Sequence, residues 1–266
     1  MTPPGNPRWA ERSLLHKGGT LATWGSLGLW DDDTPDYAAA CAALARSVAQ
    51  AAGMKAGDRV LSVACGAGDE LLLWRQEFSA AEVLGVDNDP ALVQAAQALA
   101  GVPVRLGSGT DLGALGLPAG HFDRVVCVDA AYHLRPRSAF LQQAATLLRP
   151  GGRLAFTDLT LRRGATLFNK IMFTPGTLMS GVALNQLPTP AVQRQQLQDA
   201  GFDSVQVQPL DDAVLGGFAR FVWEQGSELG SQQLSRAWKR AAYTAGFLKP
   251  CRWLGMGYAL FSGTRI

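Results

Sequence analysis

The sequence predicts an α/β fold built on a mainly parallel sheet. From Arg59 on, short apolar runs of strand length alternate with segments of helical length, which is typical of right-handed crossovers between parallel strands. Asp or Thr followed by proline marks three helix starts, because such a residue caps a helix and proline fits its first position. The 266 residues allow a full core and show no linker, so we expect one domain, residues 1–266.

The first helix is expected to begin at Thr34-Pro35 and to end at Gly53, and its apolar residues recur at helical spacing. The turn between the last helix and the last strand of the central region is expected at Arg149–Gly152. The expected elements between these points are strands at 60–63, 83–87, 102–106, 122–128 and 153–159, and helices at 70–78, 91–100 and 139–148.

Beyond Thr160 the alternation loosens. Residues 161–188 carry apolar side chains, among them Phe168, Met172 and Met179, between glycines and prolines, a composition that favours a cover over a core strand. A helix at 190–200, a strand at 204–207, a mixed helical cover at 211–250 and a last strand within 251–266 complete the prediction.

Composition excludes several classes of function. A net charge of +2 without clustered Lys and Arg gives no basic patch for nucleic acid. No apolar segment is long enough to span a bilayer and the first residues lack a signal-peptide pattern, so we expect a cytoplasmic protein. Four cysteines lie far apart, which predicts reduced thiols and no metal site.

A glycine-containing turn follows the first strand of the central region. Residues 64–68 (Ala-Cys-Gly-Ala-Gly) lie between an apolar run and a helix, and Asp87 ends the next strand. Backbone amides at such a turn and a carboxylate at the neighbouring strand end predict nucleoside binding. Leu71 stands where a dinucleotide-binding motif has its third glycine, which argues against NAD.

These motifs resemble the class I S-adenosylmethionine-dependent methyltransferases. Residues 60–68, Asp87, Asp111-Leu112 and residues 147–154 (Leu-Leu-Arg-Pro-Gly-Gly-Arg-Leu) match that family's motifs in order and spacing, over about residues 55–160. The resemblance implies a doubly wound, Rossmann-like sheet of seven strands, the last antiparallel, and S-adenosylmethionine as cofactor with S-adenosylhomocysteine as product. It implies cofactor-binding roles for Ala64, Cys65, Gly66, Gly68, Asp87, Asn88, Asp111, Leu112 and Val128.

Structural roles remain open for some of these residues. Asp87 and Asp111 are also suited to turns, and Cys65 to a structural thiol. The chain departs from the family pattern twice. Ser62 replaces an acidic residue that orients the turn and the amino group of the cofactor, and Ala64 replaces a glycine. Ala64 fits the turn if its φ angle is negative.

Candidate catalytic residues follow the fourth strand of the central region. His133 lies where this architecture places the reacting methyl group, and its near-neutral pKa suits a general base. In the small-molecule enzymes that the chain resembles, an acidic residue after the fifth strand acts with such a histidine, and Asp158 holds that position. Asp129 is a third candidate, and Tyr132 is either a substrate contact or a packing residue. His133 could instead open the next helix.

An aromatic segment precedes the first helix. Residues 16–20 (His-Lys-Gly-Gly-Thr) lead to residues 24–30 (Trp-Gly-Ser-Leu-Gly-Leu-Trp). This segment resembles one in methyltransferases of lipid-like, isoprenoid or polyketide substrates. It would serve as a lid, with Trp24 and Trp30 at the substrate, or as a strap that anchors the first helix. Residues 1–54 are thus expected to form N-terminal helices and a lid.

We therefore predict methyl transfer from S-adenosylmethionine to O, N or C of a small, largely apolar acceptor. The alternatives are a nicotinamide-dependent oxidoreductase and a catalytically silent S-adenosylmethionine-binding protein. The expected partner is the small-molecule acceptor, and a homodimer is left open.

Overall fold

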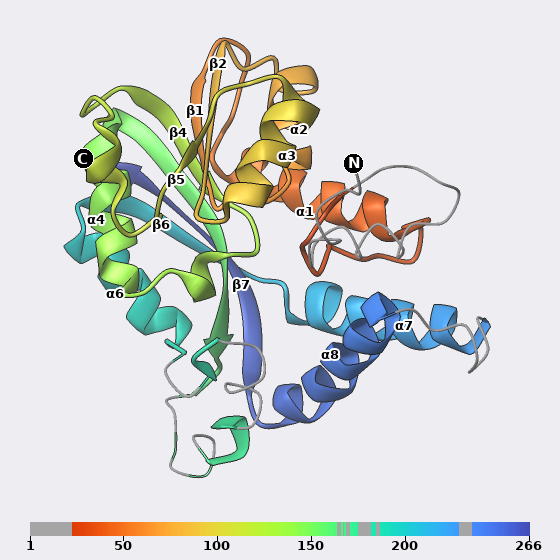
Figure 1. Ribbon diagram of the computed structural model, residues 1–266. Coiled ribbons are helices and arrows are strands. Elements are labelled where there is room, and N and C mark those ends of the chain that lie inside the picture. Colours follow the sequence, from red (N-terminus) through yellow and green to blue (C-terminus); the bar gives the residue numbers. More distant parts are fainter. Residues whose placement is uncertain are drawn as a thin grey trace.

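A computed structural model describes residues 23–163, 166, 168, 171–174, 182–184, 187–228 and 236–266. Its centre is a sheet of seven strands in the order β3-β2-β1-β4-β5-β7-β6 (Figure 1). Pairing is parallel from β3 to β5, and β7 runs antiparallel to both of its neighbours, which confirms the predicted sheet. The strands are β1 (Arg59–Val63), β2 (Glu82–Asp87), β3 (Val104–Leu106), β4 (Phe122–Cys127), β5 (Leu148–Leu161), β6 (Phe202–Pro209) and β7 (Met256–Arg265).

Helices cover both faces of the sheet, each over a buried apolar cluster. One face carries α1 (Tyr37–Ala51), α2 (Asp69–Gln76) and α3 (Pro90–Ala100), and the other carries α4 (Arg137–Leu147) and α6 (Pro190–Asp199) (Figure 1). The fold is therefore doubly wound, as predicted.

The predicted helical cover consists of two helices that pack against each other. They are α7 (Gly217–Glu228), which a π-helical turn at Asp212–Gly216 precedes, and α8 (Arg236–Trp253). The last strand therefore begins at Met256, five residues after the predicted boundary at residue 251. Phe168 and Met172 are exposed, whereas Met179 lies outside the described residues. No helix in the described part of the chain is long and apolar enough to cross a membrane.

Two of the three predicted helix caps are confirmed. Asp89 and Thr189 accept hydrogen bonds from the first turns of α3 and α6. The prediction for Thr34 was wrong, because its hydroxyl donates to the side chain of Asp31 at 2.5 Å. Asp36 caps α1 instead, accepting a hydrogen bond from the amide of Ala39 at 2.8 Å.

The predicted turn at Arg149–Gly152 was also wrong, because this segment belongs to β5 as an irregularity in its pairing with β4. Phe122 pairs with Leu148 and Arg124 with Arg153, so four residues of β5 lie opposite Asp123 alone. Arg149 is held there by an ion pair with Asp123. The strand thus starts before the proline and continues past the glycines.

Candidate active site

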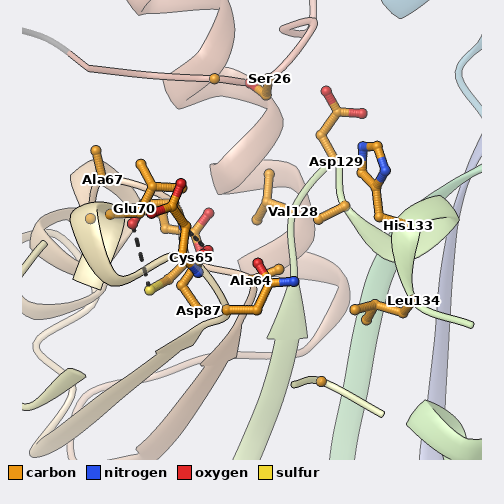
Figure 2. A pocket seen from close by; sticks show the side chains of 18 of the residues that line it. Ser26, Ala64, Cys65, Ala67, Glu70, Asp87, Val128, Asp129, His133 and Leu134 are labelled. Carbon is orange, nitrogen blue, oxygen red and sulfur yellow. Dashed lines mark hydrogen bonds between the residues drawn. The ribbon is translucent and has the colours of Figure 1, made fainter. Parts of the chain in front are cut away.

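A cavity of about 800 Å³ opens at the carboxyl ends of β1, β2 and β4, where doubly wound folds bind their ligands. Its wall is made of residues 23–26, 64–70, 87–89, 92, 107–110, 128–130 and 132–135. Figure 2 shows Cys65, Glu70 and Asp87 grouped on one side and Asp129 and His133 on the other. The cavity is large enough for a nucleoside and a small second ligand.

The turn between β1 and α2 requires glycine at Gly68. Its φ is +96°, and an added Cβ would lie 2.8 Å from the backbone of Ala96. Ala64, which ends the strand, also adopts the left-handed conformation, with φ +58°. The condition of a negative φ for Ala64 is therefore not met, and the left-handed conformation costs about 1 kcal/mol. A hydrogen bond from the amide of Cys65 to the carbonyl of Val86, at 3.1 Å, offsets part of this conformational cost.

Asp87 is fixed by the backbone on both sides. Its Oδ2 accepts from the amide of Gly66 at 2.9 Å and its Oδ1 from the amide of Asp89 at 3.0 Å. Burial raises the pKa of the Asp87 carboxyl above its ordinary value. The carboxylate therefore lies ready-oriented beside the glycine turn, with Asn88 next to it in the cavity wall. These residues fit a ligand with a vicinal diol, such as a ribose.

Glu70 is a functional candidate that sequence reasoning missed. It lines the cavity beside the turn, although it is only 6% exposed. Its Oε1 accepts a hydrogen bond from Ser62, whose Oγ also accepts one from Trp74 Nε1 at 3.2 Å. The available signal was Ser62 itself, because the place of a missing buried carboxylate can be filled from a neighbouring helix.

After β3, the residues that line the cavity are not the two that the sequence predicts. Residues 107–110 line the cavity, whereas Asp111 and Leu112 do not. Leu112 is fully buried in the apolar cluster under α4 and α6, and Asp111 is exposed at the N-terminus of a 3₁₀ turn. The interpretation of Asp111 as a turn residue therefore fits this structure better than direct contact with adenine.

Beyond β4, His133 lines the cavity from a 3₁₀ turn at Ala131–His133. Val128, Asp129 and Tyr132 line it as well. The structure therefore brings the predicted methyl-transfer residues to one end of the cavity, with the exception of Asp158.

Asp129 is a junction between segments that are far apart in the sequence. Its Oδ2 accepts from the amide of Leu27 at 2.6 Å, and its Oδ1 accepts from the hydroxyls of Tyr258 at 2.6 Å and Tyr132 at 3.1 Å. Its own amide donates to Thr157 Oγ1 at 2.7 Å. The carboxylate thereby joins the segment before α1 to β7, and its left-handed backbone (φ +52°) is held by these contacts.

Asp158 lies apart from the cavity. It is completely buried, and Arg137 binds both of its carboxylate oxygens, with Nε at 2.6 Å from Oδ2 and Nη2 at 3.1 Å from Oδ1. Burial raises its pKa, while the guanidinium of Arg137 opposes the shift. The prediction that Asp158 orients His133 was therefore wrong, because its hydrogen-bonding capacity serves an ion pair between β5 and α4.

In the segment before α1, one tryptophan has the position expected of a lid and the other that of a strap. Trp24 lines the cavity, as expected of a lid. Trp30 does not, because its ring stacks on Phe221 with centroids 4.6 Å apart and its Cβ would lie 2.3 Å from a Cβ at Gly217. Trp30 is therefore a strap residue that anchors this segment to α7. Residues 16–20 lie outside the described part of the chain.

Comparisons with known proteins agree with this geometry. A family model described as "Methyltransferase domain" matches residues 60–152. The chain is 34% identical over 212 residues to erythromycin 3''-O-methyltransferase of Saccharopolyspora erythraea, covering 75% of this chain and 68% of that protein. The chain belongs to the class I methyltransferases.

Two further matches concern the sequence and the fold. O-methyltransferase resE of Aspergillus sclerotiorum is 30% identical over 141 residues, which span 51% of this chain and 53% of that protein. The crystal structure of a geranyl diphosphate methyltransferase with sinefungin has a TM-score of 0.74 at 14% identity, covering 98% of this chain and 93% of that one. The methyltransferase thus uses S-adenosylmethionine, and the comparisons support neither the nicotinamide-dependent nor the silent alternative.

Proposed function

We propose that this methyltransferase methylates a hydroxyl oxygen of a small, largely apolar acceptor, with His133 as the general base. The observation that carries the proposal is the position of His133 in the cavity wall after β4, with Asp87 across the same cavity. The names of the two sequence relatives reported above, both O-methyltransferases, support oxygen as the acceptor atom.

The residues present fit the cofactor. Asp87 and Asn88 would hold the ribose, the amides of residues 64–68 the amino-acid half, and residues 107–110 with Val128 the adenine side. When bound, S-adenosylmethionine supplies an electrophilic methyl group. His133 takes the proton that the acceptor hydroxyl loses, an assistance of about 10²- to 10⁴-fold. Trp24 and Tyr132 would contact the acceptor and exclude water.

The proposal is tested in two steps. Calorimetry with S-adenosylhomocysteine and with NAD should show binding of the first ligand only. A panel of apolar acceptors that carry a hydroxyl or an amine is then screened for release of S-adenosylhomocysteine. Turnover of the hydroxyl compounds is expected, and turnover restricted to the amines would contradict O-methylation.

We also propose that the enzyme is cytoplasmic. All four cysteines are buried free thiols, which suits a reducing compartment. The lack of a nucleic-acid partner stays a prediction, and a homodimer stays open.

A further inference from the structure

Glu70 occupies the place of a carboxylate that this chain lacks. Ser62 stands near the end of β1, where the family pattern has an acidic residue. Its side chain is short and fully buried, and its hydroxyl donates to Glu70 Oε1. The Glu70 side chain therefore extends from the first turn of α2 to Ser62, where the family pattern has its acidic side chain.

The other carboxylates of the cavity already have partners. Asp69 accepts from the amide of Thr23 at 3.2 Å and from its hydroxyl at 2.5 Å. Asp89 caps α3, and Asp129 binds Leu27 and two tyrosines. Asp87 receives backbone amides on both oxygens.

Asp69, Asp87 and Asp129 accept hydrogen bonds on both carboxylate oxygens, and Asp89 is exposed. Glu70 differs from all four, because it is buried and only one of its oxygens is bound by a described residue. Its Oε1 binds Ser62, and among the residues that the structure describes none donates a hydrogen bond to its Oε2. A ligand in the cavity can therefore supply the donor that Oε2 still needs.

We propose that the Glu70 carboxylate binds the ammonium group of the amino-acid half of the cofactor, in place of the strand carboxylate. This inference rests on the proposed function, because it requires a ligand with an amino-acid tail beside the turn at residues 64–68. Figure 2 shows Glu70 on that side of the cavity, next to Cys65 and Asp87. A cation there would favour the ionised form of this buried carboxyl group and complete its hydrogen bonding.

The electrostatic environment gives this interaction a pH dependence. The pKa of Glu70 is raised to about 8, because burial, together with the negative charges of Asp87 and Asp69, outweighs the opposing hydrogen bond from the hydroxyl of Ser62. The thiols of Cys65 and Cys127, which interact electrostatically with Glu70, have raised pKa values because they are buried. They are therefore uncharged at neutral pH.

At pH 7 the Glu70 of the free enzyme thus carries a proton. Binding of an ammonium group favours the carboxylate and releases that proton. Affinity for the cofactor product should therefore rise as the pH rises toward 8.

The test is calorimetry of S-adenosylhomocysteine binding to the wild type, Glu70→Gln and Glu77→Gln. Glu77→Gln makes the same chemical change at the other end of α2, where Glu77 pairs with Arg46 outside the cavity. We expect Glu70→Gln to weaken binding about 10- to 100-fold at pH 8 and Glu77→Gln to leave it unchanged. Wild type should release about one proton at pH 7, measured in two buffers of different ionisation enthalpy, and Glu70→Gln should release none.

A second ligand distinguishes the binding of the amino-acid tail from the binding of the nucleoside. 5'-Methylthioadenosine lacks the amino-acid tail, so Glu70→Gln should bind it as the wild type does. Equal affinity of wild type and Glu70→Gln for S-adenosylhomocysteine would overturn the role of Glu70 and leave the proposed function intact. Failure of the wild type to bind S-adenosylhomocysteine would overturn the proposed function instead.

A swap variant keeps the proposal testable if Glu70→Gln does not fold. The double variant Ser62→Asp/Glu70→Ala returns the carboxylate to β1 and removes it from α2. We expect this variant to recover wild-type affinity for S-adenosylhomocysteine within a few-fold. If the variant folds and binds 5'-methylthioadenosine, but binds S-adenosylhomocysteine no more tightly than 5'-methylthioadenosine, the proposal fails.

Discussion

The cofactor side and the acceptor side of the molecule use their buried carboxylates in different ways. On the cofactor side, Asp87 is oriented by backbone amides of its own loops and Glu70 keeps one oxygen without a donor from the described chain. On the acceptor side, Asp129 accepts from three donors and Asp158 is bound by Arg137.

The difference teaches that an acidic residue at the carboxyl end of a strand is not by itself a site. What decides its role is whether the protein has already filled its hydrogen-bonding capacity. By this criterion Glu70 keeps an oxygen for a ligand, whereas Asp129 and Asp158 hold segments together, which leaves His133 as the proposed base.

The largest effect is expected at His133. His133→Ala should lower the rate with the true acceptor about 10²- to 10⁴-fold, because the base for the hydroxyl proton is lost. Affinity for S-adenosylhomocysteine should stay unchanged. His121→Ala is the matched control, since His121 pairs with Glu82 at the start of β2, away from the cavity. An unchanged rate in His133→Ala would remove His133 from the mechanism.

Asp158→Asn should act on stability. Removal of one partner of a buried ion pair leaves the Arg137 charge uncompensated, at a cost of about 3–5 kcal/mol, which denaturant-induced unfolding measures. Asp158→Asn/Arg137→Met should recover part of the loss. A stable Asp158→Asn protein with a slower reaction and a shifted pH profile would show instead that Asp158 acts on the base.

Asp87→Asn should weaken binding of S-adenosylhomocysteine about 10- to 100-fold, because hydrogen bonds to a charged acceptor contribute about 1.5–3 kcal/mol. The free energy of unfolding should fall by about 1 kcal/mol, since the amide keeps an oxygen for Gly66 but loses the hydrogen bond from the amide of Asp89. Asp36→Asn serves as the control, because Asn caps α1 as well as Asp does. Equal loss of affinity in both variants would point to a general effect of charge.

The smallest effect is expected at Trp24. Trp24→Ala should raise the KM for the acceptor up to about tenfold while kcat changes less, because the side chain forms part of the cavity wall. Trp223→Ala, which truncates an exposed tryptophan of α7, should leave both constants unchanged. A loss of kcat alone would place Trp24 in the chemical step.

Local patterns by themselves determined the order of strands and helices, the glycine turn and Asp87. Each of these features depends on residues close together in the sequence: apolar runs set the strands, and Gly68 allows the chain to pass close to α3. The antiparallel β7 and the positions of the cofactor motifs came from the resemblance, whose motifs occupy a continuous stretch of the chain.

Tertiary structure alone decided which carboxylates are available. Arg137 lies 21 residues from Asp158, Tyr258 lies 129 residues from Asp129, and Glu70 turns toward Ser62 because a short side chain leaves space there. Hydrogen-bond capacity is filled by neighbours in space, which no local pattern reports. For this reason the sequence predicted Asp87, Asp129 and His133 in the cavity wall correctly, but assigned Asp158, which Arg137 binds, to the wrong task.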